Sequence, residues 1–495
     1  MRNWRRRLAR SAAVLAAGAA LLLAGLGVVH LMQLSRLRRI AATPAEAYVV
    51  LSAPMLELDH VRVIDGTGDS PVGDQRILIS GGKVAYVGPR GIGPSAAGAT
   101  VIDLTGRTVL PGLVGMHEHL FTTAASESAS HLLTEQATVF PLMYLAAGVT
   151  TARTAGSIDP ERDLEVKRRI DSGAAAGPEL FLTAPYLEGQ PPTYPEMHPL
   201  ADAAEARRSV ATWAGRGMTS FKAYMTITAD ELRAAVDEAH ARGLKVTGHL
   251  CTVGFGEAAD LGIDGLEHGL VVDTEFFSGR RPGECPPFGP LLREFDARLD
   301  IASAPVQALI RRLVDRGVAV TSTLAVLDSE IGNGTAADAG RIRDALTWRA
   351  WRSAQARIAW AARFHLTHLL RKEMDFERDF VKTGGTLLAG ADPTGNGSVL
   401  AGFGDQRELE LLVAAGFTPL EAIRIATLNG AKFLGVADRT GTIEAGKQAD
   451  LVVVRGDPSA NISDIRNAEI VFRRGIGYSP EKLMAGVHGV VGLDN

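Results

Sequence analysis

Eight short apolar runs, separated by stretches with helical periodicity, occupy the middle of the chain and restrict its fold more than any other feature. The intervening stretches include 201–216, 229–242, 305–316 and 405–415. Strands that alternate with helices indicate parallel βα units, and eight in succession predict a (β/α)8 TIM barrel, an α/β fold. The residues that end such strands gather at one mouth of the barrel, where catalytic groups are expected. The runs lie near Leu113–His119, Val149–Arg153, Leu180–Ala184, Thr219–Tyr224, Lys245–His249, Gly265–His268, Val318–Thr323 and Thr386–Asp392.

The two flanks of this region have a different texture, in which short alternating runs are separated by glycine. Examples are Leu56–Asp59 and Val101–Leu104 before the barrel and Ala449–Val454 after it. This spacing is typical of a small all-β unit, so we expect a β-sandwich built from both ends of the chain. Two stretches exceed a minimal barrel, Phe276–Pro290 and Ala339–Lys382, and either could cover its mouth. The predicted divisions are 1–45 for a signal-anchor and linker, 46–112 and 435–480 for the sandwich, 113–434 for the barrel and 481–495 for a tail.

The N-terminal segment differs from the rest of the chain in charge and hydropathy. Residues 1–10 carry five arginines, residues 11–35 contain no Asp, Glu, Lys or Arg, and three further arginines lie within 36–39. Roughly 20 apolar residues span a bilayer, so this run predicts a single-pass transmembrane helix ahead of the sandwich. Because the first flank is the more positive, we expect a bacterial inner-membrane protein whose catalytic domain faces the periplasm. The alternative is cleavage after the stretch 41–47 and secretion to the periplasm.

Composition excludes several classes of protein. The chain has 52 basic and 56 acidic residues, a net charge of −4, and therefore lacks the basic field that attracts nucleic acid. Cys251 and Cys285 are its two cysteines, too few for a disulfide scaffold or a Cys-rich zinc module. The sequence leaves open whether they pair with each other.

Four histidines and one aspartate end predicted strands. Because residues i and i+2 of a strand point to the same face, His117 and His119 face the same way. His249 ends the fifth run and His268 the sixth, at the mouth that already holds the first pair. Asp392 ends the eighth run; a helix N-cap is its alternative role, but helix-forming sequence does not follow at once. Imidazole and carboxylate ligands gathered in this way predict a divalent metal site.

Lys222 lies in a largely apolar and aromatic stretch, two residues before Tyr224. Burial beside metal ions disfavours the ammonium form, and buried lysines lower their pKa readily. A neutral amine can add carbon dioxide to form a carbamate, which offers two oxygens to a pair of metals. The alternative is a lysine that reaches the barrel rim with its charge in water.

Several short motifs, together with these strand-end residues, resemble those of the metal-dependent amidohydrolase superfamily. The motifs are Leu110–Leu113, Gly148–Thr151, Glu267–Gly269 and Gly441–Leu451, and they are similar to the imidazolonepropionase-like and Xaa-Pro dipeptidase-like branch. The resemblance covers about residues 58 to 472. It implies two divalent metal ions, with Zn²⁺ as the first expectation, and a bridging hydroxide as the nucleophile.

The resemblance also assigns a role to each strand-end residue. The first metal would be held by two histidines and the aspartate, the second by the other two histidines, and a carboxylated lysine would bridge them. In that order the ligands are His117, His119 and Asp392, then His249 and His268, with Lys222 as the modified bridge; Asp392 would also be the catalytic general acid/base.

Substrate contacts are implied less completely. The residue that matches Tyr224 helps bind the substrate in dipeptidase-like members. Relatives often end the third strand in Gly-Gly-His, whereas this chain has Ala184–Gly189 there and reaches its next histidine at His198. We therefore take Tyr224 and His198 as expected substrate contacts.

The expected activity is hydrolysis of an amide bond in a dipeptide, an N-acyl amino acid or a cyclic amide. A mononuclear deaminase or a lactonase of the same superfamily is the alternative, and a catalytically inactive membrane-tethered binding protein is a third. The expected partners are a small-molecule or dipeptide substrate and the membrane, with no nucleic acid; assembly into a homo-oligomer stays open.

Overall fold

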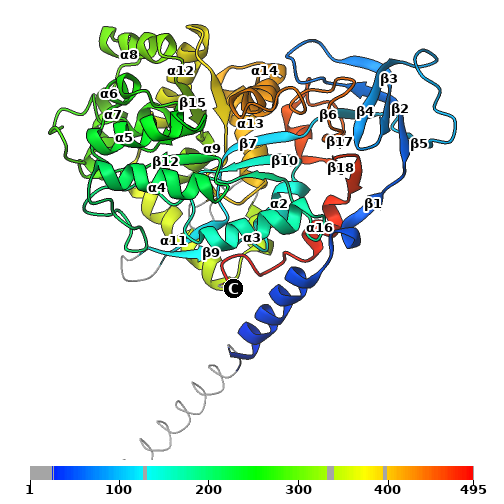
Figure 1. The fold of residues 1–495 in the computed structure, drawn as a ribbon, viewed down its shortest axis with the longest axis horizontal. Helices are drawn as coiled ribbons and strands as arrows, with labels where there is room; N and C mark the ends of the chain where they lie inside the picture. Colours follow the sequence, from blue (N-terminus) through cyan, green and yellow to red (C-terminus); the bar gives the residue numbers. More distant parts are fainter. Residues whose placement is uncertain (1–24, 26, 126–130, 332–338, 394–398, 494–495) are drawn as a thin grey trace, which may run out of the picture.

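Eight parallel strands form the centre of the molecule (Figure 1). A computed structural model describes residues 25, 27–125, 131–331, 339–393 and 399–493. Three strands form one parallel sheet and five form another. Backbone hydrogen bonds join the two sheets at both seams, from Ala184 N to Ser220 O (3.1 Å) and from Asp392 N to His117 O (2.9 Å). The strands are β7 (Leu113–Glu118), β10 (Val149–Thr154), β11 (Glu179–Phe181), β12 (Ser220–Ala223), β13 (Lys245–Gly248), β14 (Gly265–Glu267), β15 (Ala319–Ser322) and β16 (Leu387–Ala389).

Helices cover the outside of these strands. Side-chain caps begin several of them: Asp159 accepts from Arg162 N, and the Thr228 hydroxyl and Glu231 form a capping box. The α-helices are α2 (Phe140–Ala146), α3 (Pro160–Asp171), α4 (Ala203–Gly215), α5 (Ala229–His240), α6 (Phe255–Leu261), α7 (Phe288–Arg298), α8 (Ala304–Asp315), α9 (Leu324–Glu330), α10 (Ala339–Ala345), α11 (Trp348–Ala361), α12 (Leu369–Lys382), α13 (Phe403–Ala415), α14 (Pro419–Arg424), α15 (Gly430–Phe433) and α16 (Pro480–Ala485).

A nine-stranded sheet combines strands from both flanks of the barrel sequence. Strand β17 pairs with β6 in antiparallel register, from Leu451 opposite Pro111 to Arg455 opposite Arg107. Alternate β17 residues belong to different cores, because Val453 packs within the sheet's own core and Val452 packs in the barrel core. The strands are β1 (Val49–Leu51), β2 (Met55–Val63), β3 (Val72–Ser80), β4 (Lys83–Pro89), β5 (Thr100–Asp103), β6 (Arg107–Pro111), β17 (Leu451–Arg455), β18 (Ala468–Arg473) and β19 (Ile476–Tyr478); β8 (Phe121–Ala125) and β9 (His131–Glu135) form a separate hairpin.

The transmembrane helix in the predicted fold class is wrong. Among the residues that the structure describes, no helix is both long and apolar enough to cross a membrane. Most of the apolar run 11–35 lies outside the described residues. The helix that follows, residues 27–42, joins the folded body: Leu37 is buried, and the Arg36 guanidinium donates to the backbone oxygens of Ala485 and His488.

The predicted localisation depended on that helix and is also wrong. Neither the single-pass placement in an inner membrane with a periplasmic catalytic domain nor the secreted alternative is kept. What the structure shows is an α/β fold in which Arg36, just after the apolar run, bonds to the backbone near the C-terminus.

The two stretches that exceed a minimal barrel take different forms. Ala339–Lys382 folds into α10, α11 and α12, and α12 leads directly into β16. Phe276–Pro290 is mostly irregular, and its Cys285 forms a disulfide with Cys251 across 34 residues. The disulfide ties this segment to the chain just after His249, and so answers the question that the sequence left open.

Candidate metal centre

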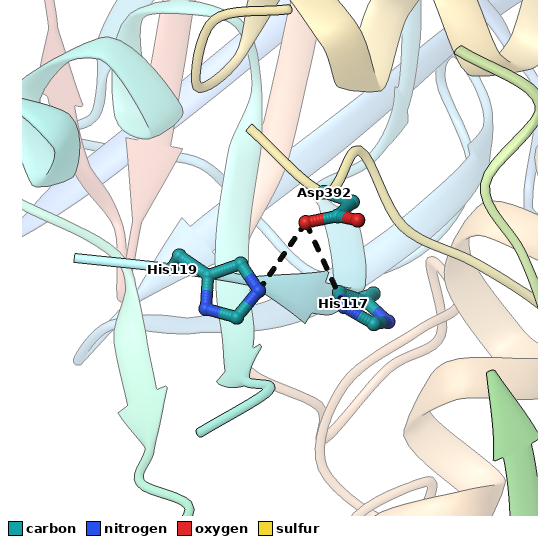
Figure 2. A group of neighbouring side chains, drawn as sticks. All are labelled: His117, His119 and Asp392. Carbon is teal, nitrogen blue, oxygen red and sulfur yellow. Dashed lines mark ion pairs between the residues drawn. The ribbon is translucent and has the colours of Figure 1, made fainter. Parts of the chain in front are cut away.

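Two histidines and an aspartate converge where β7 and β16 end (Figure 2). The Asp392 Oδ1 atom lies 3.3 Å from His119 Nε2 and 3.8 Å from His117 Nε2. One ligand atom from each of the three lies within 4.8 Å of the others, and all three side chains are buried. The strand pattern explains this arrangement. His117 lies near the end of β7, His119 follows directly after the strand, and the hydrogen bond from Asp392 N to His117 O holds the end of β16 beside them.

The other predicted ligands surround this cluster. The His268 ring lies 4.5 Å from the rings of both His117 and His249, measured between centroids. Lys222 Nζ lies 3.3 Å from His117 Nε2, and its side chain is almost completely buried. His268 Nδ1 is hydrogen-bonded to the Thr323 hydroxyl at 2.9 Å. The structure therefore brings together all six residues that the sequence predicted as metal ligands.

Burial sets the charge of these groups. It lowers the pKa of His117 to about 4 and that of His249 to about 3, with a smaller contribution from the Lys222 ammonium. Burial also lowers the pKa of Lys222 to about 8. For Asp392, burial favours the neutral acid, but the neighbouring histidines outweigh it and hold the pKa well below its usual range. Neutral imidazoles, an ionised carboxylate and a readily deprotonated amine form the donor set that a divalent metal needs.

Two of the predicted ligands have a left-handed backbone, with φ of 68° at His268 and 46° at Asp392. Side chains other than glycine rarely adopt this conformation, and such strain gathers at functional sites. Glycine is favoured after His268, because Gly269 has a φ of 71° and a Cβ there would lie 1.7 Å from Glu373 Oε1. Glu373, on α12, also accepts hydrogen bonds from Leu270 N (3.2 Å) and Val271 N (2.9 Å), which fixes the segment after the histidine.

The sequence prediction missed two residues beneath the centre, Glu267 and Arg153. Glu267 accepts hydrogen bonds from His117 Nδ1 (2.8 Å) and from Arg153 Nη2 (2.7 Å), and lies 3.9 Å from Lys222 Nζ. With its proton on Nδ1, His117 directs the Nε2 lone pair toward Asp392. Burial opposes ionisation of Glu267, but Arg153, Lys222 and His117 hold its pKa well below the usual range. The sequence did hold a signal for this pair, because Glu267 and Arg153 are charged residues within the apolar runs that form β14 and β10.

A second group of buried carboxylates lies behind the barrel strands; we call Glu373, Glu377 and Glu408 the carboxylate trio. All three are at most 1 % exposed. Burial raises the pKa of Glu373 to about 8 and that of Glu408 to about 7. Burial, and after it the charges of Glu373 and Glu408, hold the pKa of Glu377 well above its usual range. In the described part of the chain, neither carboxyl oxygen of Glu377 has a hydrogen-bond partner. Burial therefore favours the protonated form of each member of the trio.

The two predicted substrate contacts have different surroundings. The Tyr224 ring lies 5.1 Å from that of His249, and Tyr186, which the sequence did not single out, lies 4.8 Å from Tyr224. His198 is apart from these rings: its side chain is 80 % exposed and pairs with Glu205 at 3.0 Å.

Comparison with known proteins agrees with this site. The profile of the amidohydrolase family matches residues 108–275 and 387–475, just over half of the chain. A dihydroorotase from Pelotomaculum thermopropionicum is 26 % identical over 432 residues, which cover 80 % of this chain and 88 % of that protein. Adenine deaminase 3 from Rhizobium meliloti is 23 % identical over 411 residues, 81 % of this chain but 53 % of that protein. This chain thus spans about half the length of the deaminase.

Solved structures share the fold. A Xaa-Pro dipeptidase with bound methionine superimposes with a TM-score of 0.64 at 21 % identity, over 86 % of this chain and 100 % of that one. A molinate hydrolase gives a TM-score of 0.64 at 18 % identity, over 87 % of this chain and 96 % of that one. Members of the matched family use divalent metals, and the buried His-His-Asp cluster fits that use. The chain belongs to the amidohydrolase family and is a hydrolase that acts on carbon–nitrogen bonds.

Proposed function

We propose that this enzyme hydrolyses an amide bond in a dipeptide, an N-acyl amino acid or a cyclic amide, with two divalent metal ions of which Zn²⁺ is the first expectation. The observation that carries the proposal is the position of Lys222, whose buried Nζ faces His117 Nε2 at 3.3 Å beside the His117–His119–Asp392 cluster. An ammonium there would repel a metal, whereas a carbamate would bind one.

The residues fit such a pair of metals. His117, His119 and Asp392 would hold one, His249 and His268 the other, and carboxylated Lys222 would bridge them. The carboxylation is balanced as addition of the neutral amine to carbon dioxide with release of one proton. When bound, the metals supply Lewis-acid activation of water and of the scissile carbonyl.

The protein's own groups then orient the substrate and move the proton. The buried Asp392 carboxylate, held ionised by the neighbouring histidines, accepts the proton of the attacking water and passes it to the leaving nitrogen. The Tyr224 hydroxyl donates to the carbonyl oxygen or to a terminal carboxylate of the substrate. Glu267 keeps His117 in the tautomer that presents Nε2.

A mononuclear deaminase is the second candidate. It is favoured by the His117–His119–Asp392 group, which is the one cluster of histidine, cysteine and acidic ligands found among the described residues. Such an enzyme would not need Lys222 as a bridge.

The test measures metal content and activity in the wild type and in Lys222→Ala, reconstituted with and without bicarbonate. Turnover is followed on dipeptides, N-acyl amino acids and cyclic amides. We expect two metals per wild-type chain, a bicarbonate-dependent gain of metal, and loss of both metal and activity in the variant. Lys245→Ala, an exposed lysine at the other end of the next strand, is the matched control. One metal per chain with an active Lys222→Ala would favour the deaminase instead.

A further inference from the structure

Tyr186 and Tyr224, beside the metal centre, differ from the buried Tyr144 in the hydrogen bonding of their hydroxyl groups. The Tyr144 side chain is fully buried, and its hydroxyl donates to His119 O (2.9 Å) and accepts from His119 N (3.1 Å). Tyr186 and Tyr224 are half-buried, and among the described residues their hydroxyls have no hydrogen-bond partner. Buried phenols are normally paired. We call Tyr186 and Tyr224 the tyrosine wall, and its free hydroxyls are available to a ligand.

The wall is held in place by the backbone on which it stands. Leu187 N donates to Lys222 O, and Tyr224 N donates to Leu187 O, both at 2.9 Å, so the two tyrosines belong to adjacent, bonded segments. The Tyr186 ring rests on Gly156, where a Cβ would lie only 2.3 Å from the ring. Gly156 has a φ of 125°, which favours glycine for a second reason. A side chain placed so closely against backbone has little freedom to turn away.

The wall is continuous with the proposed metal ligands. Ring centroids are 4.8 Å apart between Tyr186 and Tyr224, 5.1 Å between Tyr224 and His249, and 4.5 Å between His249 and His268. A substrate whose amide reaches the histidines therefore has its neighbouring group beside the two phenol rings.

The chemistry of the wall limits what that group can be. Aromatic side chains favour a flat ring, which stacks on them or meets them edge-on. The two phenol hydroxyls add hydrogen-bond donors beside that ring.

We propose that the tyrosine wall makes Tyr186 a specificity-determining residue, and that it selects substrates with a planar group next to the scissile amide. This inference deepens the proposed function and rests on it for the position of the amide. The Tyr186 hydroxyl donates a hydrogen bond to an acceptor on the substrate, and its ring contacts the planar group.

Binding of two matched pairs of uncharged amides tests the inference without requiring turnover. Benzamide and cyclohexanecarboxamide place a ring on the acyl side, whereas acetanilide and N-cyclohexylacetamide place it on the amine side. Each pair differs in planarity and little in size. Calorimetry on the metal-loaded protein should show that the planar member of at least one pair binds about 3–10-fold more tightly.

Variants of Tyr186 separate the ring from the hydroxyl. Tyr186→Ala should remove the planar preference, and Tyr186→Phe should keep it while weakening both members by about 2–10-fold. Tyr86→Phe, which loses a hydroxyl on β4 in the nine-stranded sheet, is the matched control. Thermal midpoints measured alongside identify a variant that has lost its fold.

Each outcome decides one proposal. A wild type without planar preference, or a preference that survives in Tyr186→Ala, overturns the inference, and a Tyr186→Phe protein that binds like the wild type overturns the hydrogen bond. If the protein hydrolyses amides in the broader screen but shows no planar preference, the proposed function stands and the role proposed for the tyrosine wall is overturned. If the protein prefers planar ligands but hydrolyses no amide, the role of the tyrosine wall stands and the proposed function is overturned.

Discussion

Glu267 and the carboxylate trio are equally buried, and yet their pKa values shift in opposite directions. Glu267 contacts the Arg153 guanidinium and His117 and lies near the Lys222 ammonium, and its pKa falls well below the usual range although burial opposes this. Among the described residues, no arginine or lysine acts on the carboxylate trio, and burial raises the pKa values of all three glutamates. Burial alone therefore does not set ionisation. A nearby cation keeps a buried carboxylate ionised, so that it can orient a ligand, whereas without one burial favours the neutral acid.

Removal of the cation from Glu267 should have the largest effect. Arg153→Met keeps an apolar stem but leaves the buried carboxylate without its closest positive charge. Loss of one partner of a buried ion pair costs about 3–5 kcal/mol. Urea denaturation should show this decrease in the free energy of unfolding; a decrease below about 1 kcal/mol would mean that the His117 and Lys222 contacts suffice.

Neutralising Glu267 itself should act more on the metal centre than on the fold. Glu267→Gln keeps the volume and one acceptor oxygen, but it weakens control of the His117 tautomer. Losses of about 10–100-fold in metal affinity or kcat/KM are typical when such a supporting carboxylate is changed. Competition with a metal chelator measures the affinity. Unchanged affinity together with lower stability would reduce Glu267 to a partner for Arg153.

The protons of the carboxylate trio should make the free energy of unfolding depend on pH. Because the folded pKa values are raised, the protons are held in the native state after the unfolded chain has released them near its ordinary value of 4.5. The free energy of unfolding should therefore fall as pH rises from about 4.5 to about 8. Glu377→Gln removes one such acid. It should therefore raise the free energy of unfolding by on the order of 1 kcal/mol at alkaline pH, and change it little at a pH below the ordinary pKa of glutamate.

Thermal melts at acid and alkaline pH test that response, with the exposed Glu196→Gln as control. An equal shift at both pH values would show that Glu377 matters for packing and not for its proton.

Loss of an exposed ion pair should have the smallest effect on the free energy of unfolding. His198 is 80 % exposed and pairs with Glu205 on α4. His198→Ala should change the free energy of unfolding by less than about 0.5 kcal/mol. Its kcat/KM should stay near the wild-type value; a clear loss with the fold intact would restore His198 as a substrate contact.

The regular part of the barrel follows from the sequence, and the polar interior does not. The apolar run at Thr219–Tyr224 coincides with β12 at Ser220–Ala223, since buried parallel strands consist of near-continuous apolar residues. His117 and Asp392 could be placed because strand ends of a barrel share one mouth. Their roles as ligands stay a prediction.

The errors have physical reasons as well. Glu267 and Arg153 were missed because a strand pattern does not say which charged side chains meet across the barrel interior. The apolar run after Ser11 resembled a membrane anchor, because composition does not reveal that Arg36 bonds to the backbone near the C-terminus.

The pairing of β6 with β17 has a consequence for how the chain folds. The partners Arg107 and Arg455 are separated by most of the polypeptide, and the barrel sequence lies between them. Contacts of such long range form slowly, because a large loop must close before they stabilise anything. During synthesis β6 therefore waits as an open edge until residues 451–455 emerge, and an open edge can pair with another chain.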